Sequence, residues 1–405
     1  MKKTFAFRTM WRQYLFPLFI SLILILSILI SAGLVGCGAS TAGPEAADDT
    51  PLAVSTVDPE AVDYTPLVGD DWAVSTPAEQ GLDPKLVADL YRHAAELETL
   101  YGLLVVKNGR LIAEGYFNGA TVNQQAVLAS VTKSYVSALV GIALDQGCLS
   151  SVDQKMFDFF PEFAAQIQDP RKEQITIGDM LKMRSGYPWE EFTPPYLDTL
   201  LSNNNWLPRM VEFPLTSDPG TEFGYSNLTA HLLAVIVARA CDTDLLTYGQ
   251  EHLFSPLNAQ VGAWPYDANG YRYGSGDIAF TARDMAKFGL LYLDDGEYAG
   301  QQVISDDWVH ASLQTYSDGI YGNRLGRYFR DIGYGYLWWS ARAGAHHFNY
   351  AWGHGGNLIV LLDELDMVIV TTANPLHGVW GEEAWAKEGA IIDLVGRFIA
   401  SIPKE

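Results

Sequence analysis

Cysteine is scarce in this sequence: the chain of 405 residues contains only three, Cys37, Cys148 and Cys241. Three cysteines cannot form the dense disulfide framework that holds small secreted domains together. The chain also lacks Cys-x-x-Cys and His-Glu-x-x-His patterns. We therefore expect no metal site and no bound cofactor. No internal repeat is found, so solenoid and propeller folds are excluded.

Basic residues are also few, with 26 Lys and Arg against 48 Asp and Glu, a net charge of −22. Such a chain would repel a polyanion instead of gaining from counterion release, so nucleic acid is excluded as a partner. The composition is 48% hydrophobic and 18% charged. This is enough apolar material for one large core, or for a domain with an inserted lobe, and it excludes a disordered protein.

The N-terminus has the organisation of an export signal. An uncharged apolar run covers residues 14–35, and four basic residues precede it: Lys2, Lys3, Arg8 and Arg12. The run ends in Leu34-Val35-Gly36-Cys37, which resembles the lipobox of bacterial lipoproteins and implies cleavage after residue 36 and lipidation of Cys37. The alternative is an uncleaved transmembrane anchor, because about 20 apolar residues can span a bilayer. Both alternatives predict a membrane-tethered protein in the bacterial cell envelope, outside the cytoplasm.

A polar segment follows the apolar run. Residues 37–70 are rich in Ala, Asp, Glu, Pro and Thr and show no sustained apolar period, so we expect an acidic flexible linker before a domain at 71–405. With Cys37 reserved for lipid, Cys148 and Cys241 remain, and their spacing does not show whether they pair.

The first part of the domain predicts a helix and a hairpin. Asp83 to Leu97 carries apolar residues at helical spacing behind an Asp-Pro start. Two β-rich runs follow, joined by Asn108-Gly109, a strong signal for a two-residue hairpin. Residues 130–257 are mostly helical in pattern, with starts such as the capping box at Thr176.

Strand patterns return towards the C-terminus. We expect strands at Tyr334–Ser340, Asn357–Leu362 and Met367–Ala373, and a final amphipathic helix around residues 391–398. Two strands at the front and three at the back predict an α+β fold. Its antiparallel sheet would be flanked by N- and C-terminal helices and interrupted by an inserted, mostly helical lobe at about 145–275.

The first candidate motif is Ser130-Val131-Thr132-Lys133. A buried helical stripe follows it, marked by Val131, Tyr135, Ala138, Leu139 and Ile142. Residues three apart share a helix face, so Lys133 can bring its amine to the hydroxyl of Ser130 and activate it as a nucleophile. The alternative makes Ser130 a helix cap and Lys133 a solvated side chain. A second Ser-x-x-Lys at 401–404 contains a proline and lies near the chain end.

The second candidate motif is Tyr225-Ser226-Asn227, at a turn that leads into a strongly apolar helix. A phenol beside an ammonium group can relay a proton or act as an anionic base, and an asparagine can hydrogen-bond both a lysine and a substrate amide. The alternative is that Ser226 or Asn227 only caps the helix.

The third candidate motif is His354-Gly355-Gly356, which precedes the strand that we expect from Asn357. Glycine allows a ligand to approach the strand backbone closely, and an edge strand can offer N–H groups to a developing oxyanion. The alternative is a hairpin with a surface histidine.

In this order and context, the three motifs resemble those of the penicillin-recognising serine hydrolases. The resemblance is to the class C β-lactamase-like family, which includes D-alanyl-D-alanine carboxypeptidases, esterases and 6-aminohexanoate-dimer hydrolases. It covers about Trp72 to Ile399 and extends to phrases such as "ITIGDMLKMRSGYPW", "PGTEFGYSN" and "GSGDIAFTARDMAKFGLLYLDDG". It implies a β-lactamase/transpeptidase-like fold.

The resemblance also implies residue roles. Ser130 would be the acylated nucleophile and Lys133 its proton acceptor, while Tyr225 would pass a proton to the leaving group. Asn227 would position Lys133 and the acyl side chain. The backbone N–H of Asn357 would join that of Ser130 in the oxyanion hole.

The chain departs from the family at the third motif, because His354-Gly355-Gly356 stands where β-lactamases have Lys-Thr-Gly. Histidine is only partly charged near neutral pH and glycine has no hydroxyl, so efficient β-lactam hydrolysis is not expected.

Our leading hypothesis is a serine hydrolase that forms an acyl-enzyme on a small ester or amide. The alternatives are a D-alanyl-D-alanine carboxypeptidase or β-lactamase, and a non-catalytic envelope binding protein. Three aromatic residues near the motifs have two interpretations, as the lining of an acyl pocket or as core residues: Tyr187, Trp189 and Trp264.

Overall fold

The computed structural model describes residues 63–69, 71–376, 379 and 381–404. The expected signal at 1–36, the lipidated Cys37 and most of the expected linker lie outside the described residues. The last part of that linker is held by the domain: the N–H of Leu67 donates to Glu114 (2.8 Å), and its carbonyl accepts from Arg283 (2.6 Å). Among the described residues, no helix is both long enough and apolar enough to cross a membrane.

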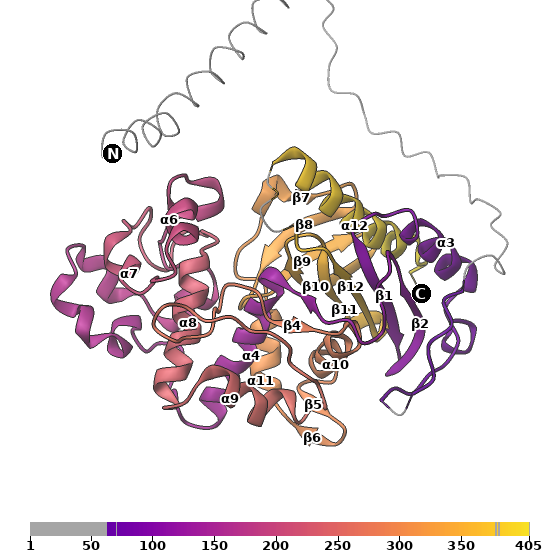
Figure 1. The fold of residues 1–405 in the computed structure, drawn as a ribbon, viewed down its shortest axis with the longest axis horizontal. Helices are drawn as coiled ribbons and strands as arrows, with labels where there is room; N and C mark the ends of the chain where they lie inside the picture. The colour runs from indigo at the N-terminus through magenta and orange to yellow at the C-terminus, as the bar shows by residue number, and fades with distance from the viewer. Residues whose placement is uncertain (1–62, 70, 377–378, 380, 405) are drawn as a thin grey trace, which may run out of the picture. The chain divides into compact units, whose positions relative to one another are not determined.

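The main sheet is antiparallel, and within the described residues it has eight strands in the order β2-β1-β12-β11-β10-β9-β8-β7 (Figure 1). These strands are β1 (Leu100–Lys107), β2 (Arg110–Tyr116), β7 (Arg324–Leu325), β8 (Phe329–Tyr334), β9 (Trp339–Ala343), β10 (His346–Gly353), β11 (Asn357–Leu362) and β12 (Met367–Ala373). Two short pairs complete the β-structure: β3 (Ala126–Val127) with β4 (Ala279–Phe280), and β5 (Glu297–Tyr298) with β6 (Gln301–Gln302).

The predicted hairpin is confirmed. Asn108 and Gly109 join β1 and β2 and have φ angles of 50° and 66°, the left-handed values that a two-residue turn of this kind requires. The strands predicted at Asn357–Leu362 and Met367–Ala373 are confirmed as β11 and β12. β1 pairs with β12, so the two ends of the domain meet in one sheet.

The strand predicted at Tyr334–Ser340 is wrong. β8 ends at Tyr334, β9 begins at Trp339, and the residues between them form a turn. Leu337 has a φ of 59°, its N–H donates to Leu181, and its carbonyl accepts from the hydroxyl of Ser134. These contacts with the helical region override the β-propensity of the aromatic run. The C-terminal half of the sheet therefore has more strands than the three that we expected.

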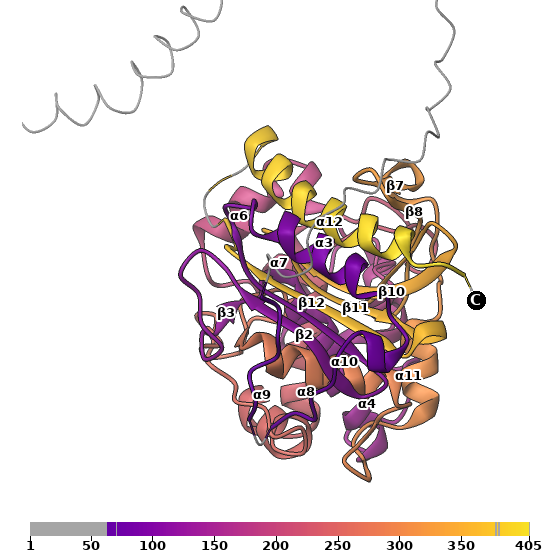
Figure 2. The same cartoon turned by 90° about the vertical axis from the view of Figure 1, so that its right-hand side faces the viewer.

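Helices cover both faces of the sheet. α3 (Pro84–Ala94) and α12 (Glu382–Ser401) lie side by side on one face (Figure 2), and α10 (Ala282–Leu293) packs on the other. Asp83 caps α3 by accepting from the N–H of Lys85, so the predicted Asp-Pro start is confirmed. The flanking terminal helices and the antiparallel sheet match the expected α+β architecture.

Most of the other helices lie between β3 and β4 in the sequence (Figure 1). They are α4 (Thr132–Asp145), α5 (Ile177–Leu181), α6 (Tyr196–Ser202), α7 (Arg209–Glu212), α8 (Asn227–Ala240) and α9 (Leu245–Gly249), and α11 (Asp306–Leu313) follows α10. Short 3₁₀ segments are η2 (Ala78–Gln80), η3 (Ala129–Val131), η4 (Met156–Phe159), η5 (Pro161–Gln166), η6 (Pro170–Gln174), η7 (Glu190–Phe192), η9 (Ile320–Asn323) and η10 (Asp363–Leu365), and η8 (Gln250–Phe254) is a π-helix. The capping box at Thr176 is confirmed at the start of α5.

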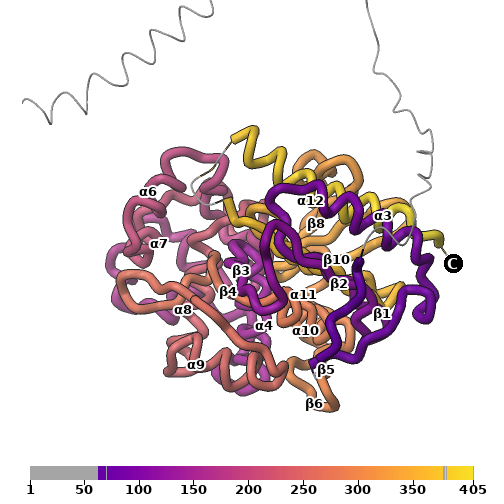
Figure 3. Tube along the Cα trace, turned by 45° about the vertical axis from the view of Figure 1, so that its right-hand side comes forward, coloured from indigo at the N-terminus to yellow at the C-terminus, as the bar shows by residue number. Residues whose placement is uncertain are grey.

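α4 and α8 pack against each other (Figure 3). Just beyond their C-terminal ends, Cys148 and Cys241 form a disulfide, with their Cα atoms 5.1 Å apart. The opposite ends of the same two helices carry the first and second candidate motifs. The disulfide therefore links the two helices that the candidate site depends on.

Candidate active site

Ser130 lies in η3, directly before α4, and its side chain is partly exposed. The preceding residue, Ala129, has a φ of 46°, a left-handed conformation that is unusual for a residue with a side chain. Its carbonyl accepts from the hydroxyl of Thr132 (2.6 Å) and from the N–H of Asp277 (3.3 Å). The turn is thus fixed from two sides and presents Ser130 at the helix start.

Lys133 is buried, with 1% of its surface exposed. Its amine donates to the hydroxyl oxygen of Ser130 (2.8 Å), to Oδ1 of Asn227 (2.9 Å) and to the carbonyl of Ser275 (2.6 Å). The alternative of a solvated lysine is therefore wrong. The three acceptors, Ser130, Asn227 and Ser275, are far from one another in the sequence, and the amine of Lys133 brings them together.

Burial lowers the pKa of Lys133 to about 8, because a charged amine loses its hydration there. The carboxylates of Glu191, Glu190 and Asp277 act in the opposite direction and raise the pKa. A substantial fraction of Lys133 is therefore uncharged near pH 8, as a proton acceptor for a serine must be.

Tyr225 lies against the same amine, with Nζ of Lys133 4.8 Å from the centre of its ring. The ring stacks on Trp339 at 5.5 Å. Burial raises the pKa of Tyr225 well above its ordinary value, and a hydrogen bond with Ser130 lowers it by less. The phenol is therefore protonated in the free site, which favours the proton relay over the anionic base among the roles expected for it.

Ser226 caps α8, with its hydroxyl oxygen accepting from the N–H of Thr229 at 3.0 Å. The capping interpretation thus holds for Ser226. Asn227 has another position: its Oδ1 accepts from Lys133 and its Nδ2 donates to Glu191 (3.4 Å). The asparagine thus connects the buried amine with a carboxylate of the cavity wall.

Glu190 is a buried acidic residue that no sequence motif marks. Its carboxylate accepts from the hydroxyl of Ser226 (2.8 Å) and from the N–H groups of Asn227 (2.9 Å) and Leu228 (3.2 Å). Burial raises the pKa of Glu190 to about 7, although these hydrogen bonds oppose the shift. The carboxyl group holds the N-terminus of α8, and with it the second motif, in place.

His354 lies in the turn between β10 and β11, and 21% of its side chain is exposed. Its Nδ1 is 2.8 Å from the carboxylate of Glu388, which also accepts from the N–H of Gly355 (3.0 Å) and from the indole of Trp352. Burial lowers the pKa of His354, but the hydrogen bond and the charge of Glu388 raise it by more. The pKa of His354 therefore lies above its ordinary value. The alternative interpretation, a hairpin with a surface histidine, is correct for the backbone, which forms the hairpin. It is wrong for the side chain, because Glu388 of α12 holds His354 in place. No motif marked Glu388 in the sequence.

Gly355, Gly356 and Asn357 shape this turn and do not line the cavity. The two glycines have φ angles of 89° and 97°, and the side chain of Asn357 bonds to the N–H of Ala373 (2.9 Å) and to the carbonyl of His354 (3.1 Å). The residue that approaches the nucleophile is Gly353.

A Cβ atom on Gly353 would lie 2.0 Å from the carbonyl oxygen of Leu128 and 3.2 Å from the backbone nitrogen of Ser130. No real Cβ makes a contact as short as the first, so only glycine fits there without movement of the backbone. The end of β10 is thus packed directly on the turn that carries Ser130.

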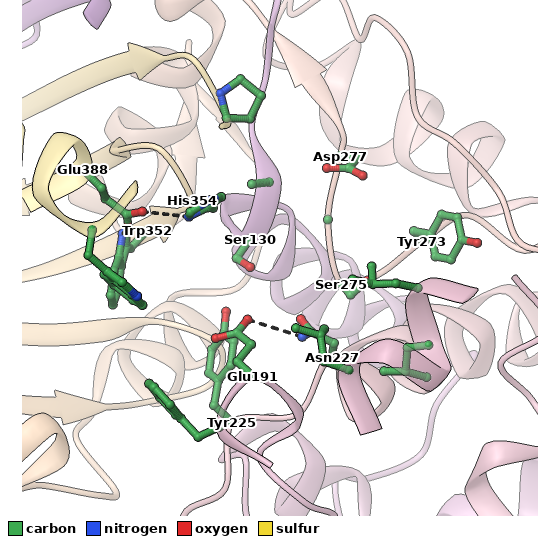
Figure 4. Close-up of a pocket in the computed structure, with 18 of the residues that line it drawn as sticks. Ser130, Glu191, Tyr225, Asn227, Tyr273, Ser275, Asp277, Trp352, His354 and Glu388 are labelled. Atoms are coloured by element: carbon green, nitrogen blue, oxygen red, sulfur yellow. Dashed lines mark hydrogen bonds and ion pairs between the residues drawn. The ribbon is translucent and has the colours of Figure 1, made fainter. Parts of the chain in front are cut away.

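A cavity of about 540 Å³ lies over Ser130, and Figure 4 shows Glu191, Tyr225, Asn227 and His354 around the serine. Its described lining is largely aromatic and aliphatic, with acidic residues and no Lys or Arg: Phe192, Leu197, Leu200, Leu201, Trp206, Tyr225, Tyr273, Tyr321, Trp339, Trp352 and Trp385, with Glu191, Asp277 and Glu388. Tyr187, Trp189 and Trp264 are not among its described lining residues. Tyr187 and Trp264 are buried in the core, which confirms that interpretation for them, and Trp189 is partly buried and packs against the core. Within the described ranges, no group of His, Cys, Asp and Glu could hold a metal ion.

The comparisons with known proteins agree with this geometry. Residues 92–392 match the family model described as Beta-lactamase. The chain belongs to the beta-lactamase family. This confirms the resemblance that the motifs indicated.

A curated relative is the 6-aminohexanoate-dimer hydrolase of Paenarthrobacter ureafaciens, 27% identical over 224 residues, which are 52% of this chain and 56% of the relative. The chain spans about half the length of the curated relatives that it matches.

Among solved structures, a putative 6-aminohexanoate-dimer hydrolase from Bacillus anthracis is similar, with a TM-score of 0.61, 20% identity and coverage of 86% of this chain and 90% of that one. The octameric penicillin-binding protein homologue from Pyrococcus abyssi has a TM-score of 0.56 and 18% identity, over 77% of each chain. These neighbours confirm the β-lactamase/transpeptidase-like fold.

Proposed function

We propose that this beta-lactamase family member is a serine hydrolase that forms an acyl-enzyme at Ser130 on a small ester or amide. The observation that carries the proposal is the hydrogen bond of 2.8 Å between the buried amine of Lys133 and the hydroxyl oxygen of Ser130. A buried lysine with a lowered pKa can take the serine proton near neutral pH, which a solvated lysine cannot do.

The acylation step follows from these positions. The uncharged amine of Lys133 accepts the proton of Ser130 as the serine oxygen attacks the acyl carbon. Tyr225 gives its proton to the departing alcohol or amine and recovers one from Lys133, so the protons balance. Water then hydrolyses the acyl-serine ester and regenerates Ser130.

The oxygen of the tetrahedral intermediate needs N–H donors close to the nucleophile. The sequence suggested the N–H groups of Ser130 and Asn357. Because Gly353 is the residue of the β10–β11 hairpin that adjoins Ser130, we propose the second donor in the segment 353–354 instead. Removing one such donor typically costs about 10²–10³ in rate.

The cavity favours substrates without a carboxylate. No Lys or Arg is found among its described lining residues, and His354 is paired with Glu388. β-Lactams and D-alanyl peptides carry a carboxylate that would meet Glu191 and Asp277 there. A neutral or cationic ester or amide is therefore the better substrate.

We also propose that the protein is a lipoprotein of the bacterial cell envelope, tethered to a membrane through Cys37 and located outside the cytoplasm. The lipobox-like end of the apolar run supports this location. The disulfide between Cys148 and Cys241 is consistent with it, because disulfides persist in oxidising compartments.

Covalent labelling tests the proposal. Wild-type protein treated with a fluorophosphonate probe should gain one adduct by intact mass, and Ser130→Ala should gain none. Ser401→Ala, which alters the serine of the other Ser-x-x-Lys, is the matched control and should label like wild type. Equal labelling of wild type and Ser130→Ala would exclude the acyl-enzyme.

The rival hypothesis is a non-catalytic binding protein of the envelope. It predicts saturable binding of peptidoglycan fragments with no adduct and no turnover. Release of D-alanine from D-alanyl-D-alanine peptides would instead favour the carboxypeptidase alternative.

A further inference from the structure

His231 and Asp267 form a fully buried pair that the proposed chemistry does not use. Nε2 of His231, in α8, lies 3.3 Å from Oδ2 of Asp267. Because a carboxylate can only accept hydrogen bonds, the proton of the imidazole lies on Nε2. Burial raises the pKa of Asp267, but hydrogen bonds from His231, Asn269 and Tyr271 lower it by more, so the carboxyl group is ionised. A buried charge is costly unless it is paired and hydrogen-bonded, so this pair needs a role that justifies it.

Asp267 shapes the turn that follows it. Its Oδ1 accepts from the N–H groups of Asn269 and Tyr271, both at 2.9 Å. Its Oδ2 accepts from Nδ2 of Asn269 (2.9 Å) as well as from His231. The carboxylate therefore closes the turn 267–271, and the histidine attaches this turn to α8.

The residues after the turn reach the candidate site. A Cβ atom on Gly274 would collide with the carbonyl oxygen of Ala230, so this part of the chain lies directly on α8. The carbonyl of Ser275 accepts from the amine of Lys133 (2.6 Å), and the charge of Asp277 raises the pKa of that amine. Figure 4 shows Ser275 and Asp277 together on one side of the cavity. The position of the segment 273–277 on α8 therefore acts on the proposed base.

The same histidine supports an aromatic wall of the cavity. The ring centre of His231 is 5.2 Å from that of Trp206 and 5.4 Å from that of Tyr273. The two aromatic rings are 5.1 Å apart and both line the cavity, whereas the imidazole is buried behind the described lining. The wall and the acceptor of the lysine are thus held by one buried group.

We propose that His231 and Asp267 are a positioning pair of the active site: they fix the segment 273–277 on α8, and with it one acceptor of the proposed base and one aromatic wall of the cavity. Neither residue touches the reacting atoms, and both act through Lys133 and the wall. This inference rests on the proposed function and adds the residues that position its base.

Loss of the pair should change Lys133 in a defined direction. The segment 273–277 brings a carbonyl and a carboxylate to the amine, and both favour its charged form. The other titratable groups that face the amine, Glu190, Glu191 and Tyr225, lie outside this segment. Loosening of the segment should therefore lower the pKa of Lys133 and leave the amine less well positioned.

Three substitutions of the histidine separate the hydrogen bond from the packing. His231→Phe keeps a ring against the aromatic wall and loses the donor. His231→Asn keeps an amide that is too short to reach Asp267. His231→Gln keeps a donor, because Nε2 of glutamine can take the place of Nε2 of histidine. His252→Phe, the same change at a partly exposed histidine outside the described cavity lining, is the matched control.

The pKa of Lys133 can be measured without a substrate. Lysine labelled with carbon-13 at Cε is titrated by NMR in the whole protein, and Lys133→Ala assigns the signal. In His231→Phe and His231→Asn the pKa should fall by about one pH unit, as expected for a weakened hydrogen bond to a charged group. In His231→Gln and His252→Phe it should stay at the wild-type value.

Single-turnover acylation by a p-nitrophenyl ester gives a second measurement. In His231→Phe the acid limb should lie at lower pH by the same amount, and the plateau rate should fall by about tenfold or more, because the base is less well placed. His231→Gln should restore both. A merely structural role would lower the melting temperature and leave the pH at which Lys133 titrates unchanged.

An unchanged pKa of Lys133 in folded His231→Phe and His231→Asn would overturn the inference. So would a shift in His231→Gln as large as in His231→Phe, since the ring and not the hydrogen bond would then be responsible. If the pKa shifts as expected but wild-type Ser130 is not labelled by a fluorophosphonate, the positioning stands and the proposed function fails. If Ser130 is labelled and the pKa does not move, the proposed function stands and the positioning fails.

Discussion

Lys133 on α4 and Asn227 on α8 are joined by a hydrogen bond of 2.9 Å between Nζ and Oδ1. The two residues are 94 positions apart in the sequence. The bond sets the register of the two helices at the end where Ser130 lies, while the disulfide joins them at the other end. Substitutions at these two connections and at the groups next to them should therefore have separable effects on acylation and on stability.

Lys133→Ala should reduce the acylation rate by about 10²–10⁴, the usual contribution of a positioned base. Lys133→Arg should be similarly inactive, because arginine keeps its charge and cannot accept the proton. In wild type, acylation should rise with pH through about 8, where Lys133 loses its proton. Stopped-flow acylation across pH 6–10 measures this. A rate that is flat through that range would contradict the assignment.

Tyr225→Phe should slow acylation by about 10²–10⁴ and leave the melting temperature nearly unchanged, because the ring still stacks on Trp339. The loss should be larger for amides than for activated esters, whose leaving groups need no proton. Tyr334→Phe, at a neighbouring buried ring, is the control and should retain activity. Near-normal turnover of amides by Tyr225→Phe would remove the proton relay.

Glu190→Gln should flatten the dependence of stability on pH. The pKa of this buried carboxyl rises from 4.5 to about 7 in the folded protein, so the folded state holds its proton more tightly than the unfolded state does. The protonated carboxyl group therefore adds to the free energy of unfolding, by an amount of the order of 3 kcal/mol. This stabilisation is fully present below about pH 4.5 and is lost as the pH rises through about 7. Urea unfolding at pH 5, 6 and 7 measures the difference, with Glu222→Gln as the control. Parallel wild-type and Glu190→Gln curves would show that the prediction is wrong.

Gly353→Ala should reduce acylation at least tenfold, because its Cβ would collide with the carbonyl of Leu128 and displace the turn of Ser130. Gly389→Ala is the matched control, since a Cβ there meets no atom within 4 Å. That control should keep full activity and gain up to about 1 kcal/mol from better helix propensity. Equal activity of the two variants would disprove the close approach.

Cys148→Ser with Cys241→Ser should lower the free energy of unfolding by about 2–4 kcal/mol, because the bond closes a loop across a sequence separation of 93. A reducing agent should destabilise wild type by a similar amount and leave the double variant unchanged. Thermal unfolding with and without reductant measures both effects. A double variant as stable as wild type would show that the link contributes nothing.

The local patterns that the sequence presents most clearly are those the structure reproduces. The hairpin at Asn108-Gly109 and the strands β11 and β12 follow from turn chemistry and continuous apolar runs. The run at Tyr334–Ser340 misleads, because its aromatic residues are typical of strands. The left-handed Leu337 there is fixed by Leu181 and Ser134, contacts that no local pattern reveals.

The candidate site divides in the same way. Ser130, Lys133, Tyr225 and Asn227 lie in motifs, and the structure brings them together. Glu190, Glu191 and Glu388 belong to no motif, and each depends on tertiary packing to reach the site. The close approach of Gly353 could not be predicted either, because it depends on how the end of β10 packs on the turn of Ser130.

The position of Glu388 in α12, far downstream of Ser130 in the sequence, has a consequence for biosynthesis. The carboxylate that anchors His354 and the turn next to Ser130 is translated after the serine and the lysine. A chain still emerging from the ribosome holds Ser130 and Lys133 but lacks the group that fixes this turn. The site is therefore complete only once the last helix has been synthesised and has folded onto the sheet.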